Sequence, residues 1–146
     1  MHAHLLNEKQ KRSVAVTLRL FEERLTEVER LLTVQERGVL YERVAHFSPR
    51  QQEKMRALID EARGVIQDMA REFELERDIQ NPARRIFGLL SITWESLEEL
   101  HSKPLKAYGA VDPRLPEVID PLAEKLARLA VEIRRAAAHG EDGKTP

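Results

Sequence analysis

Apolar residues recur at alternating steps of four and three along most of the chain, with charged residues between them. The clearest run lies in the first third and contains Val14, Leu18, Phe21, Leu25, Val28 and Leu32. This spacing places an apolar stripe along one side of an α-helix. It predicts a helix over about residues 5–35.

A second helix is predicted over about residues 49–78. Ser48 precedes Pro49, and Gln51 occupies the third helical position, which is the pattern of a capping box. The stripe behind this start repeats the same steps at Met55, Ile59, Ala62, Ile66, Met69 and Phe73. The helix is expected to stop before Pro82, because a residue preceding proline disfavours the helical region.

The segment Asn81–Ser102 is the most apolar part of the chain and contains its single tryptophan, Trp94. Asn81 is a favourable N-cap, and Pro82 stands where a missing N–H has no cost. Apolar residues surround much of this predicted helix. They indicate a central helix that contacts more than one neighbour.

The last helix is expected to begin either at Pro116 or at Asp120, after a long connection over residues 104–116, and to end near His139. The residues expected to face the core in this helix are Leu122, Leu126, Leu129, Ile133 and Ala136. Residues 141–146 are expected to form a flexible tail.

Residues 38–47 predict a short extra helical segment that caps one end of the fold. Leu40, Val44 and Phe47 follow the helical steps, but out of phase with the stripe before Gly38. Whether the first helix continues through Gly38 stays open, because a glycine costs a helix only about 1 kcal/mol.

No segment alternates between apolar and polar residues as a half-buried strand does. The fold class predicted is therefore all-α. The expected architecture is an antiparallel up-down four-helix bundle, and residues 1–146 are expected to form a single domain.

The amino-acid composition argues against several classes of function. The chain carries 24 basic and 25 acidic residues, a net charge of -1, which argues against binding nucleic acid or anionic membranes through bulk charge. The absence of cysteine excludes disulfides and thiolate chemistry. No apolar run is long enough to cross a bilayer, and no secretory signal opens the sequence, so a cytoplasmic protein is expected.

Two pairs are candidate metal ligands. Glu42 and His46 are four residues apart, and Glu98 and His101 are three apart, so each pair would share one face of a helix. Only one Glu-x-x-His is present, which argues against a di-iron centre of the ferritin type. No cofactor is otherwise indicated.

Arg84 and Arg85 stand in the first turn of the central helix, where acidic residues are usual. Together with free N–H groups at that helix start they form a candidate anion-binding site. A nucleic-acid interface would add the basic residues near the N-terminus, which are Lys9, Lys11 and Arg12.

The first functional hypothesis is a structural or protein–protein interaction module that self-associates, with a dimer favoured, or docks a partner. Heptad-like spacing in every predicted helix supports it, and the candidate interaction residues are Phe21, Phe87 and Trp94. The alternative is a bundle that binds a metal or small molecule at the end near His46 and His101, with a sensory or catalytic role. No nucleophile motif or phosphate loop points to an enzyme.

Overall fold

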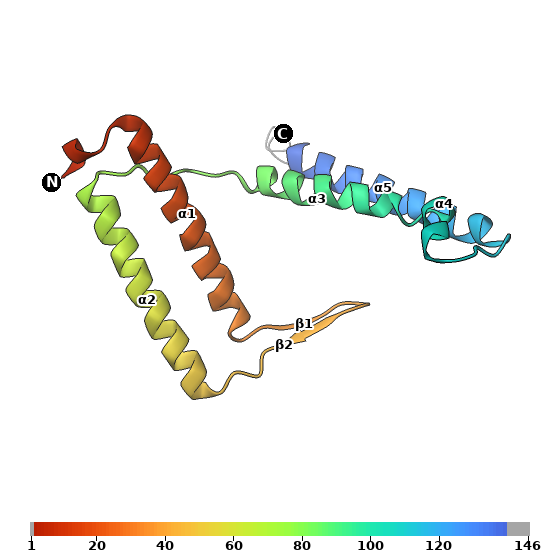
Figure 1. Cartoon of the computed structure of the whole chain (residues 1–146), viewed down its shortest axis with the longest axis horizontal. Helices are drawn as coiled ribbons and strands as arrows, with labels where there is room; N and C mark the ends of the chain where they lie inside the picture. The colour runs from red at the N-terminus through yellow and green to blue at the C-terminus, as the bar shows by residue number, and fades with distance from the viewer. Residues whose placement is uncertain (1, 140–146) are drawn as a thin grey trace, which may run out of the picture. The chain divides into compact units, whose positions relative to one another are not determined.

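The computed structural model describes residues 2–139 and is predominantly helical, as predicted. The chain divides into two compact units, Met1–Asp78 (unit 1) and Ile79–Pro146 (unit 2). Each unit is built on one pair of antiparallel helices (Figure 1).

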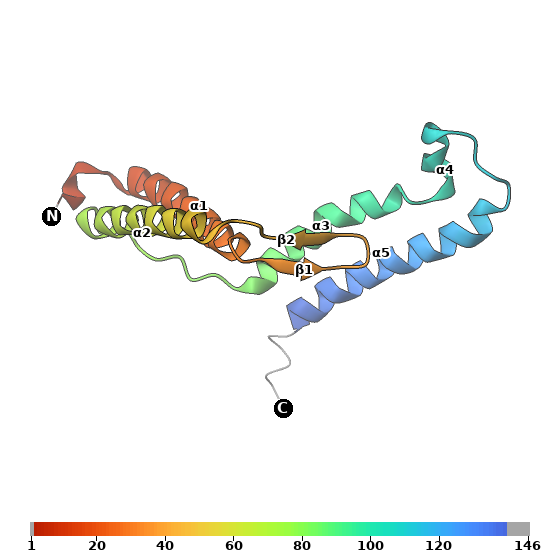
Figure 2. The same ribbon diagram turned by 90° about the horizontal axis from the view of Figure 1, so that it is seen from below.

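In unit 1 the helices are α1 (Glu8–Leu31) and α2 (Pro49–Glu72), which run side by side in both Figure 1 and Figure 2. The Ser48 start is confirmed, because the Ser48 hydroxyl accepts from the Gln51 N–H and the Gln51 side chain accepts from the Ser48 N–H. Asn7 and Gln10 form the same reciprocal capping box at the start of α1. Local sequence therefore determines where both helices begin.

The core of unit 1 lies between these helices. Its buried members are Leu25, Leu32, Ile59 and Ile66, with Leu18, Met55 and Ala62 packed against them. All seven belong to the predicted apolar stripes. The stripes of α1 and α2 are thus the surfaces that hold these two helices together as a helical hairpin.

The extra helical segment predicted over residues 38–47 is wrong. The chain leaves α1 at Leu31 and forms an antiparallel β-hairpin of β1 (Gln35–Arg37) and β2 (Glu42–Val44), in which Glu36 pairs with Arg43. The first helix therefore ends before Gly38. Strands of three residues are too short to show an alternating pattern, which is why the helical spacing misled the prediction.

Charged side chains join this hairpin to α1. Arg30, near the end of α1, hydrogen-bonds Glu36 of β1 as well as Glu27 of its own helix. Arg43 of β2 donates to the other oxygen of Glu36 at 3.0 Å. The hydrogen bond from Arg30 is the largest cause of a lowered pKa of the Glu36 carboxyl, and the positive charge of Arg43 adds to it.

The second helix ends at Glu72, earlier than the predicted residue 78. Glu74 adopts the left-handed conformation, with φ 51°, and the N–H of Leu75 donates to the carbonyl of Ala70 at 2.9 Å. With the bond from the Glu74 N–H to Arg71, this is a Schellman motif. The motif usually contains glycine at the left-handed position, so the sequence contained no signal for it.

Unit 2 contains α3 (Pro82–Glu98), α4 (Ser102–Leu105), the 3₁₀ helix η2 (Lys106–Tyr108) and α5 (Leu115–His139). The Asn81 start of α3 is confirmed, because the Asn81 side chain accepts from the Ala83 N–H. The helix ends at Glu98, four residues before the predicted end.

The last helix begins one residue before the Pro116 alternative. The Asp120 alternative is wrong, because Asp120 lies within α5. Its carboxylate accepts from the backbone N–H of Ser102 at 2.8 Å and from the Ser102 hydroxyl at 3.1 Å. Asp120 thus supplies, from α5, the capping interaction that α4 lacks at its own N-cap.

The coarse fold class agrees with the sequence, apart from the small two-stranded sheet. The single-domain, four-helix, up-down arrangement is not confirmed by the two units and stays a prediction. Within residues 2–139, no helix is long and apolar enough to cross a membrane. The predicted tail at 141–146 lies outside the described residues.

Candidate functional site

The two edges of the α1–α2 contact differ in chemistry. Along one edge, Arg63 of α2 donates to both carboxylate oxygens of Glu29 on α1, at 2.8 and 3.3 Å. A weaker bond at 3.5 Å connects Arg63 to the Thr26 hydroxyl. This edge is therefore closed by polar contacts, and the hydrogen bond from Arg63 lowers the pKa of Glu29.

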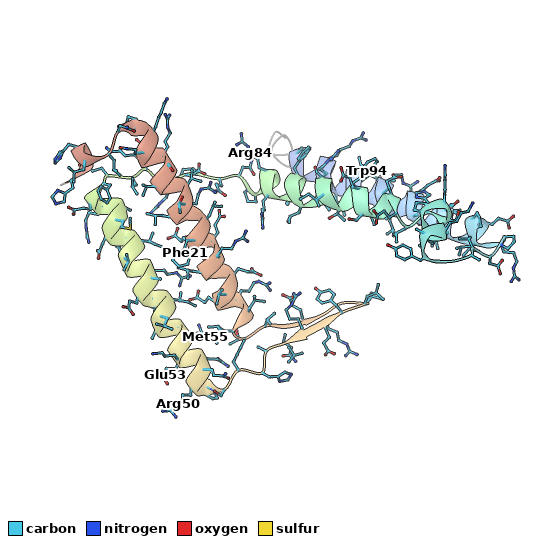
Figure 3. All side chains as sticks on the ribbon, in the orientation of Figure 1. Phe21, Arg50, Glu53, Met55, Arg84 and Trp94 are labelled. Atoms are coloured by element: carbon cyan, nitrogen blue, oxygen red, sulfur yellow. The ribbon has the colours of Figure 1, made fainter. Side chains whose placement is uncertain are left out.

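Along the other edge, apolar side chains remain open to solvent. Four of them are at least two-fifths exposed, and we call this set the open face of unit 1: Phe21, Val28, Leu58 and Val65. Figure 3 labels Phe21 on α1 and Met55 on α2, which mark the two helices of this contact.

Helix geometry explains why these four residues share one face. Phe21 follows the core-facing Leu18 by three residues, and Leu58 directly precedes the core residue Ile59. At about 100° per residue, both steps rotate a side chain in the same sense away from the core. Because the two helices are antiparallel, rotation in the same sense about each helix axis turns both side chains to the same side of the helix pair. Glu29 follows Leu25 by four residues, which rotates it to the opposite edge.

In unit 2, too, the helix α5 has one buried side and one exposed apolar side, and its buried residues are small. The buried residues of α5 between Leu115 and Ala138 are Ala123 and Ala130, at 1% and 7% exposed. The predicted core residues Leu122, Leu126, Leu129 and Ile133 are 58%, 47%, 38% and 55% exposed. We call these four the α5 seam. Within unit 2 the buried positions of α5 are therefore the alanines and not these four residues, and the expectation that the four face the core of a four-helix bundle stays a prediction.

On the edge of the α3–α5 pair opposite the α5 seam, an arginine connects the two helices, as Arg63 does in unit 1. The guanidinium of Arg134 on α5 lies 4.6 Å from the ring centroid of Phe87 on α3. The same side chain donates to the Ser91 hydroxyl at 3.3 Å. Arg134 thus holds α3 to α5 on the side that the α5 seam does not occupy.

The predicted interaction residues fall on different surfaces. Phe21 belongs to the open face of unit 1, whereas Phe87 is partly covered by Arg134. Trp94, labelled in Figure 3, is seven residues after Phe87 and shares its side of α3. Sequence reasoning missed Leu58, Val65 and the α5 seam as surface residues. Leu58 and Val65 directly precede the stripe residues Ile59 and Ile66, and the α5 seam is itself the predicted apolar row.

The predicted metal ligands are not gathered into a cluster. Glu42 opens β2 and His46 lies two residues beyond the end of that strand, so the two residues do not share one face of a helix as expected. His101 Nδ1 lies 3.1 Å from the backbone carbonyl of Glu98 and not from its carboxylate. Among the described residues, no group of three or more His, Cys, Asp or Glu is placed to hold a metal ion.

Arg84 and Arg85 lie exposed in the first turn of α3, as predicted (Figure 3 labels Arg84). Two of the N–H groups at this helix start are already bonded within the chain. The Ala83 N–H donates to the Asn81 side chain at 2.9 Å, and the Arg84 N–H donates to the Asn81 carbonyl at 3.1 Å. The anion site at these arginines stays a prediction.

A hollow of about 690 Å³ lies at the start of α2. Its lining comes from one continuous stretch, residues 47–57, and includes Arg50, Glu53 and Met55, which Figure 3 labels. The Ser48 and Gln51 side chains are occupied there by their capping box. Because its lining comes from successive turns of one helix, the hollow is an open groove, unlike the enclosed pockets that bind small molecules.

Comparison with known proteins found no matching family model, no matching curated protein and no matching solved structure. The surface chemistry of the two units is therefore what bears on function.

Proposed function

We propose that this protein is a self-associating interaction module whose two-helix units pack through their uncovered apolar faces into four-helix, antiparallel assemblies. The observation that carries the proposal is the row of exposed Leu, Val, Ile and Phe side chains at helical spacing along one edge of each hairpin. Monomeric soluble proteins seldom expose contiguous apolar patches of this kind.

Two features support self-association. The exposed apolar side chains of both units are continuous with the stripes that already hold each pair of helices together. A two-helix layer also buries little on its own, and covering its open side is the usual way in which helical layers gain stability.

Two opposing free-energy terms predict that the association is reversible. Covering eight half-exposed Leu or Ile side chains, four from each copy, contributes roughly 6–12 kcal/mol on the usual scale for apolar burial. The loss of translational and rotational freedom opposes this by about 4–15 kcal/mol. Because the two quantities are comparable, we expect an equilibrium that shifts with protein concentration.

Sedimentation equilibrium of the full chain over a wide range of concentrations tests the proposal. We expect the mean mass to rise from the 16.9 kDa of one chain towards twice that value. A chain that stays at 16.9 kDa at every concentration contradicts self-association, and a docking function for the same faces would then require a different protein partner.

A further inference from the structure

The α5 seam is an apolar surface with a regular heptad pattern, and the described residues of unit 2, up to residue 139, leave it uncovered. Leu122, Leu126, Leu129 and Ile133 follow one another at steps of four, three and four, and each is more than one-third exposed. The alanine stripe, Ala123 and Ala130, lies beside this seam, on the side of α5 from which Arg134 contacts Phe87 and Ser91 of α3. The contact with α3 therefore leaves the seam free for another helix.

We propose that the α5 seam pairs antiparallel with the α5 seam of a second copy of this chain. This inference rests on the proposed function, and it names the helix, the direction and the register of the association. The second copy is chosen because the charges along α5 complement their own reversed order.

The charge distribution along α5 favours the antiparallel direction. Residues 115–124 carry three acidic side chains and no basic one. Residues 125–139 carry four basic side chains, Lys125, Arg128, Arg134 and Arg135, and one acidic side chain, Glu132. An antiparallel pair lays the acidic half of one helix along the basic half of the other, whereas a parallel pair places like halves together.

The residues that border the seam support the same direction. One border is the alanine stripe, and the other carries Lys125 and Glu132. In an antiparallel pair of helices, the same border of each helix faces its counterpart, so Lys125 meets Glu132 of the second copy, twice by symmetry. In a parallel pair, the charged border would meet the alanine border and no ion pair would form.

These two charges also select one register. When Lys125 faces Glu132 of the second copy, Leu126 lies opposite Leu129 and Leu122 lies opposite Ile133. A shift by one heptad in either direction places Lys125 opposite Lys125, or Glu132 opposite Glu132, and like charges repel. The register with all four seam residues paired is thus also the one with matched charges.

Because α3 occupies the alanine side of each α5, the proposed dimer contains four helices: two α5 helices in the centre, each with its own α3. This arrangement is a four-helix assembly built from two copies of unit 2.

Charge reversal in the full chain tests the pairing. We expect Lys125→Glu and Glu132→Lys each to raise the dimer dissociation constant roughly tenfold or more, since each variant places like charges together at two symmetric sites. The double variant Lys125→Glu/Glu132→Lys restores opposite pairs and should return the dissociation constant close to that of the wild type. Lys9→Glu, at an exposed position of α1 half a turn away from the core-facing Leu18, is the matched control for net charge and should leave the dissociation constant unchanged.

Circular dichroism of each variant checks that the helices are intact. This matters for Glu132→Lys, because Glu132 also lies 4.0 Å from Arg128 within α5. The double variant also lacks this ion pair, so equal helix content in the three variants assigns the recovery of dimerisation to the contact between copies.

Cysteine cross-linking gives a second readout, since the chain contains no cysteine of its own. We expect a mixture of Leu122→Cys and Ile133→Cys chains to form disulfide-linked dimers on mild oxidation. Either variant alone should not, because its two cysteines would lie about 16 Å apart along an antiparallel pair. Cross-linking of each variant with itself would overturn the antiparallel direction.

The outcomes separate this inference from the proposed function. If the wild type dimerises but the single charge reversals do not change its dissociation constant, or the double variant does not restore it, the α5 pairing is overturned. Self-association would then take place through another face. A wild-type chain that is monomeric at every concentration overturns both.

Discussion

Arg63 of α2 and Glu29 of α1 are joined by two hydrogen bonds, at 2.8 and 3.3 Å, between positions 34 residues apart in the sequence. The pair lies along the polar edge of unit 1, opposite Phe21 and Leu58. It therefore gives the hairpin a closed side and an open side, a distinction that the heptad spacing alone does not contain.

Replacing Arg63 by methionine should lower the melting temperature of the protein at neutral pH. Arg63 lowers the pKa of Glu29 in the folded state, so this contribution is fully present above the ordinary glutamate pKa near 4.5. It is lost as the pH falls through the lowered pKa, where Glu29 becomes protonated. Thermal unfolding followed by circular dichroism should show a difference between wild type and Arg63→Met that shrinks at acidic pH.

The matched control for that experiment is Lys54→Met, which removes a basic side chain from an exposed position on the same helix. It should change the melting temperature less than Arg63→Met at neutral pH. An Arg63→Met difference of equal size at every pH would show that the ion pair with Glu29 is not its source.

Substitutions at two neighbouring residues of α2 should differ in their effect on the free energy of unfolding. Ile59 is 4% exposed in the core, and Leu58 is 51% exposed on the open face. Ile59→Ala should reduce the free energy of unfolding by about 2–5 kcal/mol because it leaves a cavity. Leu58→Ala should cost about 0.5 kcal/mol or less, as at other surface positions. Urea denaturation at low protein concentration measures both, and equal losses would contradict the assignment of the two faces.

The β-hairpin gives a direct spectroscopic prediction. The bonds from the Gly38 N–H to Tyr41 and from the Ala45 N–H to Val34 fix which residue pairs exchange hydrogen bonds. Arg37–Glu42 and Gln35–Val44 are then the closely spaced pairs, with Cα atoms about 4.5 Å apart. Nuclear Overhauser effects between the α-protons of each pair are expected. Effects between residues three apart in this segment would instead indicate a helix.

Loss of the Asp120 carboxylate should loosen the start of α4. Asp120 accepts from the Ser102 N–H, and Ser102 is buried. Asp120→Ala should speed hydrogen exchange of the Ser102 amide, because its acceptor is removed. Asp120→Asn keeps one oxygen acceptor and should have a smaller effect, so equal exchange rates in the two variants would contradict the role given to the carboxylate.

The start signals of the helices could be predicted from sequence because they are local. Ser48 with Gln51, and Asn81 with Pro82, satisfy backbone groups within one turn, and both starts are confirmed. The helix ends could not be predicted as well. The Schellman motif places Glu74 in a conformation usually taken by glycine, and α3 ends without a glycine signal.

The candidate surfaces could be predicted only in part. The sequence identified Phe21 as an interaction residue and identified the α5 seam as an apolar row, but it assigned that row to the core. It also predicted a helical segment over residues 38–47, because three apolar residues at steps of four and three fit a helix as well as they fit a short β-hairpin and its flank.

The sequence by itself determined that this chain forms long amphipathic helices and where most of them begin, since helical spacing and capping depend on residues within a few positions of each other. Only the tertiary structure decided which stripe of each helix is covered. On α5 the alanine stripe and the leucine row lie side by side, and the choice between them depends on the shape of α3, far away in sequence. The small side chains of Ala123 and Ala130 allow α3 to approach closely, and the leucines are left on the open side.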